Sequence, residues 1–170
     1  PQGASTITQQ VAKNFLVGSE QNIERKIREA LVALRIESAY SKDKILELYL
    51  NEIYLGLSAY GIAAASLIYY DKSVHELSIA EAAYLAALPK APSTLHPFRM
   101  RDRALERRNW VIDRMVENGY IAAADGEAAK KEPLNVSPRP TGAHMFAAEY
   151  FAEEVRREIY ERYGEKKLYE

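Results

Sequence analysis

The chain has 170 residues, enough for one domain with a hydrophobic core, and its 48% hydrophobic and 28% charged residues are typical of a globular protein. A formal net charge of −1 gives no overall attraction to nucleic acid, so none is expected as a partner. The lack of cysteine excludes disulfides and thiol catalysis, and three scattered histidines do not form a zinc pattern. No apolar run approaches the ~18–20 residues that span a bilayer.

Uncharged hydrogen-bonding side chains dominate residues 3–10, "GASTITQQ". Ile7, Val11 and Phe15 recur every four residues, which predicts a helix that buries this face in the core. Ser5 is the expected N-cap, because its hydroxyl can accept a hydrogen bond from the first turn. A chain that opens on "PQGAS", without an initiating methionine or a signal peptide, is expected to be a piece of a longer protein.

Residues 21–37, "QNIERKIREALVALRIE", predict a second helix. Its expected apolar face consists of Ile23, Ile27, Ala30, Leu31 and Leu34.

The other side of this helix is polar and mostly basic. Glu29 is an i,i+4 neighbour of Arg25 and an i,i+3 neighbour of Lys26, and Arg28 lies close by. Two interpretations stay open: a solvated face with helix ion pairs, or a lining for phosphate or pyrophosphate in which cations hold the carboxylate ionised. In the second interpretation Lys13 joins the basic cluster, and the hydroxyls and amides of residues 5–10 orient the anion.

The rest of the chain also predicts helices. Ser41 should cap a helix at 42–51, residues 60–70 should form a tightly packed internal helix, and Ser78 with Glu81 should form a capping box. A proline-rich irregular stretch should separate this helix from a long basic helix that ends at Asn118-Gly119. A short helix near 122–131 follows. No alternating strand pattern occurs, so we expect an all-α fold.

Four blocks of sequence, taken together, carry a resemblance to a known family. They are "GASTITQQ", "RKIREALVALRIE", "KILELYLNEIYLG" with the following "AYGIAAA" and "YY", and "LSIAEAAYLAALPKAPS". In this order they resemble the peptidoglycan glycosyltransferase (family 51) domain of bifunctional, class A penicillin-binding proteins. The resemblance implies a mostly helical, lysozyme-like fold. It also implies an enzyme that polymerises lipid II into glycan strands and releases polyprenyl pyrophosphate.

The resemblance also implies roles for individual residues. Glu29 matches the second of the family's two key carboxylates, and we expect it to orient or stabilise charged groups rather than to act as a general acid. Tyr49 and Asn51 are expected either to support the site through buried hydrogen bonds or simply to pack. The substrate-binding residues implied are Ser5, Thr6, Thr8, Gln9, Gln10, Lys13, Arg25, Lys26 and Arg28.

The family's first key carboxylate is absent from these 170 residues. In the family it is the general base, a glutamate in a Glu-Asp motif, and its expected place is before Pro1. The chain alone is therefore expected to bind substrate without turning it over.

The implied partners are lipid II and the growing glycan chain, the membrane surface, and phosphoglycolipid inhibitors of the moenomycin type. The implied location is the outer, periplasmic face of the bacterial cytoplasmic membrane, and a divalent cation (Mg or Mn) is a possible cofactor. The glycosyltransferase domain is expected at 1–131, a linker at 132–142, and at 143–170 a helix that leads toward a transpeptidase domain. Two alternatives remain: a lysozyme-like glycan-cleaving enzyme and a non-catalytic module that binds lipid-linked precursor.

Overall fold

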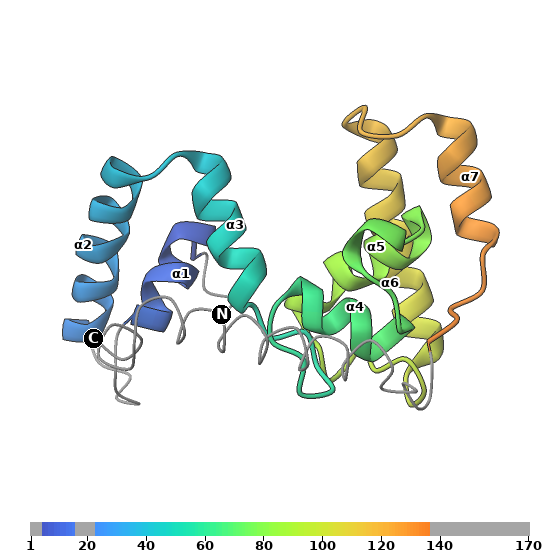
Figure 1. Cartoon of the computed structure of the whole chain (residues 1–170), viewed down its shortest axis with the longest axis horizontal. Coiled ribbons are helices and arrows are strands. Elements are labelled where there is room, and N and C mark those ends of the chain that lie inside the picture. Colours follow the sequence, from blue (N-terminus) through green and yellow to red (C-terminus); the bar gives the residue numbers. More distant parts are fainter. Residues whose placement is uncertain (1–4, 16–22, 137–170) are drawn as a thin grey trace, which may run out of the picture.

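A computed structural model describes residues 5–15 and 23–136, and every regular element in these ranges is a helix (Figure 1). Between Tyr54 and Tyr60 there is one isolated antiparallel bridge. The predicted all-α fold is therefore confirmed. The elements are α1 (Ile7–Phe15), α2 (Ile23–Ala39), α3 (Lys42–Glu52), α4 (Ile62–Tyr70), η1 (Val74–Glu76), α5 (Ile79–Ala87), η2 (Leu88–Lys90), α6 (Arg101–Glu117) and α7 (Ala123–Lys131).

Side chains near the helix starts supply the acceptors that the first backbone amides need. The predicted cap of Ser41 on α3 and the capping box of Ser78 with Glu81 on α5 are both confirmed. The predicted Ser5 cap on α1 is wrong, because α1 begins at Ile7 and Thr6 is the residue that immediately precedes it. The Thr6 hydroxyl accepts from the Gln9 amide at 3.1 Å, and the Gln9 side chain accepts from the Thr6 amide at 3.1 Å.

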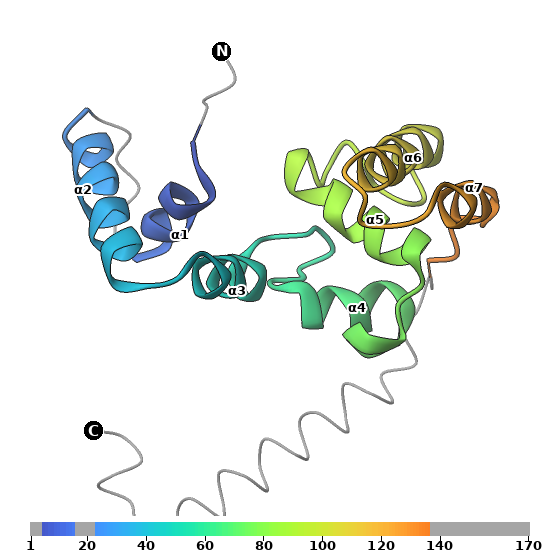
Figure 2. The same cartoon turned by 90° about the horizontal axis from the view of Figure 1, so that it is seen from above.

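The helices form two groups. Helices α1, α2 and α3 pack together, and α4 to α7 form the second group, with α3 and the loop after it joining the two (Figures 1 and 2). The core of the first group consists of Val11, Ala12, Ala33, Ile36 and Ile45. The second group has a larger core, built around Leu55, Tyr69, Tyr84, Leu85 and Leu88.

The expected apolar face of α2 is not the face that the structure buries, and on α1 the expected face is only partly buried, with Val11 in the core. Ile23 is 81% exposed and Leu34 is 64% exposed, and Ile7 on α1 is also exposed. The face of α2 that meets α1 carries Glu29, Ala33 and Ile36 instead. Small side chains explain why these faces of α1 and α2 meet. Ala12 on α1 and Ala33 on α2 let the two backbones approach closely. The prediction that Ile7 lies in the core is therefore wrong.

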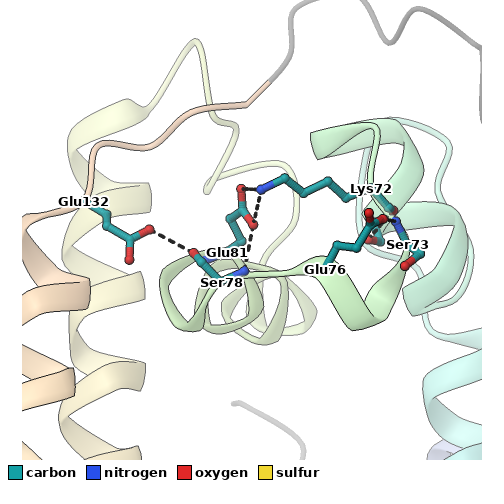
Figure 3. Close-up of polar contacts among 7 residues, drawn as sticks. Lys72, Ser73, Glu76, Ser78, Glu81 and Glu132 are labelled. Atoms are coloured by element: carbon teal, nitrogen blue, oxygen red, sulfur yellow. Dashed lines mark hydrogen bonds and ion pairs between the residues drawn. The ribbon is translucent and has the colours of Figure 1, made fainter.

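Polar contacts tie the start of α5 to its neighbours. Both carboxylate oxygens of Glu81 accept from the Lys72 ammonium, at 2.8 and 3.0 Å, and one of them also accepts from the Ser78 amide (Figure 3). The Ser78 hydroxyl in turn donates to Glu132 at 2.9 Å. These contacts connect the segment after α4, the start of α5 and the segment after α7, so they hold the second helical group in one arrangement.

One arginine of the basic helix α6 is buried, although the charged side chains of such a helix are ordinarily exposed to solvent. Arg108 is 1% exposed and donates to the backbone carbonyls of Glu132 at 2.7 Å and Lys130 at 3.0 Å. Just beyond these carbonyls, Leu134 and Val136 enter the core, so the first residues of the expected linker pack against the domain. The remaining expected linker and the helix expected at 143–170 lie outside the described residues.

Three buried tyrosines should make the fold sensitive to alkali. Burial raises the pKa of Tyr69, Tyr70 and Tyr84 well above the ordinary value of 10.0. In the unfolded chain these phenols ionise near pH 10, whereas the folded chain keeps them neutral. The free energy of unfolding should therefore be fully retained below pH 10 and should fall as the pH rises above it. Urea unfolding between pH 8 and 11.5 measures the slope.

Tyr84→Phe separates this effect from lysine deprotonation in the same pH range. The Tyr84 hydroxyl donates to the Leu95 carbonyl at 2.7 Å, so the variant should be less stable at neutral pH. Its free energy of unfolding should nevertheless fall less steeply above pH 10, because one raised pKa has been removed. If the free energy of unfolding fell equally steeply with pH in both proteins, the raised pKa of Tyr84 would not be the cause.

Candidate anion-binding site on α1 and α2

Glu29 is the most unusual charged residue of the first helical group. It is 4% exposed, yet it lies on a helix surrounded by arginine and lysine. Its carboxylate pairs with Arg25, whose Nε lies 3.4 Å from Oε1, and with the Lys26 ammonium. A buried carboxylate requires such partners, since an isolated charge out of water is costly. The i,i+3 and i,i+4 spacings therefore form real ion pairs at the centre of a site.

The two cations that pair with Glu29 differ in their access to a ligand. The Lys26 side chain is 63% exposed and the Arg25 side chain is 20% exposed. The Lys26 ammonium has three donors and Glu29 accepts from one, so it can bind a second anion while still paired. Arg25, closer to the interior, holds the carboxylate in place. The cluster combines a fixed negative charge with positive charge that solvent and ligands can reach.

Arg28 pairs with a different carboxylate from Arg25 and Lys26. It binds Glu24 at 2.5 Å, and both side chains are about two-thirds exposed, at 66% and 69%. This is the solvated helix ion pair of the first interpretation. The first interpretation therefore applies at Arg28, and the buried Glu29 carboxylate with its two cations leaves the second interpretation open.

The polar residues of α1 divide into groups with different surroundings. Thr6 and Gln9 bind each other in the helix cap, and Thr8 is 5% exposed, with its hydroxyl donating to Glu37 at 2.7 Å. Ser5 and Gln10 are partly exposed. The hydroxyls of Thr6 and Thr8 thus already have protein partners, whereas Ser5 and Gln10 leave polar surface for a ligand.

The Thr8–Glu37 hydrogen bond sets how α1 lies against α2. It joins the start of α1 to the end of α2, so the two helices run antiparallel. Lys13, five residues after Thr8, therefore lies about 7.5 Å further along α1 and is exposed. Glu29 lies about 12 Å back along α2 from Glu37. Lys13 and the Glu29 cluster accordingly belong to the same half of this helix pair.

The two residues expected to support the site lie on α3. Tyr49 is half-buried against the core of the first helical group, and burial raises its pKa. Asn51 is exposed, and its backbone carbonyl lies against Gly61 at the start of α4. Tyr49 therefore packs against the core that α1 and α2 form with α3, and Asn51 lies where the two helical groups meet.

Sequence reasoning missed Glu37 as a site residue. No local pattern marks it, because its partner Thr8 is 29 residues away. Within residues 5–15 and 23–136, no three acidic or histidine side chains gather in a way that could hold a metal ion. Glu29 is already paired with two cations, so the described residues do not fit a protein-held Mg or Mn site. Among the described helices, none has the length and apolar character needed to cross a membrane.

The described helices form an all-α domain in which a buried carboxylate lies between two cations, beside a helix of hydroxyl and amide side chains, and such an arrangement can accept an anionic ligand. Residues 1–116 match the family model described as Transglycosylase. The chain therefore belongs to the transglycosylase family, and the resemblance found in the sequence is confirmed.

The similar proteins are penicillin-binding proteins 1A. The chain is 51% identical to the one from Aquifex aeolicus over 96% of its own length and 22% of that protein, and 49% identical to the one from Escherichia coli over 96% and 19%. It also superposes on the crystal structure of penicillin-binding protein 1A from Haemophilus influenzae, with a TM-score of 0.52, 35% identity, and coverage of 99% of this chain and 22% of that one. The chain thus spans about a fifth of the length of these relatives.

Proposed function

We propose that this chain is part of a peptidoglycan glycosyltransferase that polymerises lipid II into glycan strands and releases polyprenyl pyrophosphate. The observation that carries the proposal is the buried Glu29 carboxylate with Arg25 and Lys26 as partners, in a chain of the transglycosylase family. The proposed location is the outer face of the bacterial cytoplasmic membrane, and phosphoglycolipids of the moenomycin type are proposed to occupy the same site.

The chemistry of the reaction explains why the site is basic. When the sugar–phosphate bond breaks, negative charge develops on the leaving pyrophosphate. Cations fixed in advance stabilise that charge without having to reorganise. Lys13, Lys26 and Arg28 are exposed cations in this half of the helix pair, and Glu29 holds Lys26 in place through their ion pair. Deprotonation of the acceptor hydroxyl is assigned to a general-base glutamate in a Glu-Asp motif, not to Glu29.

The same contacts separate this proposal from a glycan-cleaving enzyme. Cleavage by a pair of carboxyl groups needs one of them protonated, as the general acid. Glu29 forms ion pairs with two cations, Arg25 and Lys26, which suits a group that positions positive charge. The structure therefore favours an electrostatic role over proton donation. If a divalent cation takes part, we propose that the pyrophosphate oxygens of the substrate hold it.

Binding without turnover tests the anion site directly. Lys26→Ala should weaken the binding of a moenomycin-type phosphoglycolipid to this chain roughly tenfold, because a charge-assisted hydrogen bond is worth about 1.5–3 kcal/mol. Arg28→Ala should weaken it by a similar factor if the exposed Glu24 releases Arg28 to the ligand. Isothermal titration calorimetry at two salt concentrations measures both variants, and the unaltered chain should bind more weakly at the higher salt concentration.

Lys44→Ala is a matched control for Lys26→Ala. Lys44 pairs with Glu47 at 2.7 Å with the same i,i+3 spacing, but on α3, and both side chains are about half exposed. Its removal should leave phosphoglycolipid affinity unchanged. Equal affinities for the unaltered chain, Lys26→Ala and Arg28→Ala would overturn the pyrophosphate assignment, while equal losses for Lys26→Ala and Lys44→Ala would indicate a non-specific charge effect.

A further inference from the structure

A second site candidate lies in the other helical group. A cavity of about 380 Å³ opens between the segment at η2 and the outer side of α6. Lys90 and Leu95 line it from the η2 side, and Arg103, Glu106, Arg107 and Trp110 line it from α6. Its volume falls in the range of small-molecule sites. None of these residues belongs to the Glu29 cluster.

The charged groups around this cavity are not neutralised by one another. Lys90, Arg103 and Arg107 form no ion pair with a carboxylate in the described part of the chain, and Glu106 forms none with a cation. The cavity therefore presents three positive charges and one negative charge to whatever enters it. Elsewhere on the same helix, Arg114 pairs with Glu117.

Trp110 holds one of these cations in position. The guanidinium carbon of Arg107 lies 3.8 Å from the centroid of the Trp110 ring, the geometry of a cation–π contact. Arg107 Nε is buried and donates to no acceptor among the described residues. Stacking thus fixes the guanidinium plane without using its donors. Trp110 and Leu95 add an apolar wall next to this preorganised cation.

We propose that this cavity binds a short peptide segment that ends in a free carboxylate. The carboxylate would bind Arg103, Arg107 and Lys90, while an amine or amide N–H of the same segment would donate to Glu106. Its apolar side chains would lie against Leu95 and Trp110. A ligand that carries both signs of charge fits this lining better than a phosphate, which Glu106 repels. On the proposed function, which this step extends, the ligand is the peptide attached to the disaccharide of the substrate.

Trp110 makes the test direct, because it is the single tryptophan of the sequence. The probe is the synthetic tripeptide acetyl-Lys-Ala-Ala with a free C-terminal carboxylate, titrated into the unaltered chain while tryptophan fluorescence is recorded. We expect saturable binding, and at least tenfold weaker binding of the same peptide as its C-terminal amide. Arg103→Gln should weaken the carboxylate form roughly tenfold. Arg103 is exposed, and circular dichroism checks that the variant keeps its helix content.

Arg101→Gln is the matched control, because Arg101 is an exposed cation at the start of the same helix and does not line the cavity. It should bind the peptide as the unaltered chain does. Equal affinity for the acid and amide peptides would overturn the inference. So would displacement of the peptide by inorganic phosphate at equal concentration, or the absence of any saturable fluorescence change.

The result of the peptide titration does not depend on the Glu29 site. The peptide titration involves no turnover and no lipid, and Glu29→Gln should leave peptide affinity unchanged. Peptide binding by this chain, together with no polymerisation by a form of the protein that includes a Glu-Asp motif, would remove the proposed function alone. Polymerisation with no peptide binding would remove only this inference.

Discussion

Replacing Glu29 with glutamine is expected to lower glycan polymerisation at least about 100-fold, the scale of losing one key electrostatic group in an active site. Glutamine keeps the size of the side chain but removes the charge that pairs with Arg25 and Lys26. The Lys26 ammonium then loses its fixed partner and no longer has a defined position beside the leaving pyrophosphate. The assay is conversion of lipid II to polymer by a form of the protein that includes a Glu-Asp motif upstream of Pro1.

Glu47→Gln provides the comparison. Glu47 is an exposed glutamate that also has a lysine partner at i,i+3, but it lies on α3 and outside the candidate site. Its replacement should leave polymerisation unchanged. Circular dichroism and thermal unfolding check that Glu29→Gln folds. A folded Glu29→Gln protein with near-normal turnover would reduce Glu29 to a structural ion pair.

Gly61→Ala is expected to destabilise the fold by about 3 kcal/mol or more, because backbone strain and overpacking act together. Gly61 has a φ of +79°, and a Cβ there would lie 2.3 Å from the Asn51 carbonyl oxygen and 2.9 Å from its carbon. Both are backbone atoms of α3, so no side-chain rotation relieves the clash. The Gly61 amide also donates to the Ile53 carbonyl at 2.9 Å, so a shift would break the link between the two helical groups.

Gly119→Ala measures the cost of backbone strain alone, without the steric clash expected at Gly61. Gly119 has a similar φ of +73°, and an added Cβ would meet no atom within 4 Å. Gly119→Ala should lower the free energy of unfolding by only about 1 kcal/mol, the strain of placing a non-glycine residue in the left-handed conformation. Urea unfolding of the two variants and the unaltered chain, followed by circular dichroism, gives both values. Equal losses at the two positions would show that the contact with Asn51 does not matter.

The helix starts could be predicted where the hydrogen bonds involved are local. The Ser41 cap and the Ser78–Glu81 box use residues three positions apart, so the pattern contains both partners. At α1 the same reasoning predicted Ser5 as the cap, one residue before the actual cap, Thr6. It identified the cap type but not that Gln9 closes the box on Thr6.

The candidate anion site could be predicted in part for the same reason. Arg25, Lys26 and Glu29 lie within one turn of a helix, so their ion pairs follow from spacing. The burial of Glu29 does not follow from spacing. It depends on which face of α2 receives α1, and the periodicity of the apolar residues pointed to a different face from the one that is buried.

By itself, then, the sequence determined the all-α fold, most helix boundaries, the family and the ion pairs of α2, since all of these rest on short-range spacing or on motifs. Only the tertiary structure decided which helix faces are buried, that Arg108 lies in the interior, and that Lys90 meets Arg103, Arg107 and Trp110 around one cavity. Arg108 is buried because backbone carbonyls of Lys130 and Glu132, more than twenty residues later in the chain, accept its donors. Such partners come together only when the helices pack, so no local pattern reveals them.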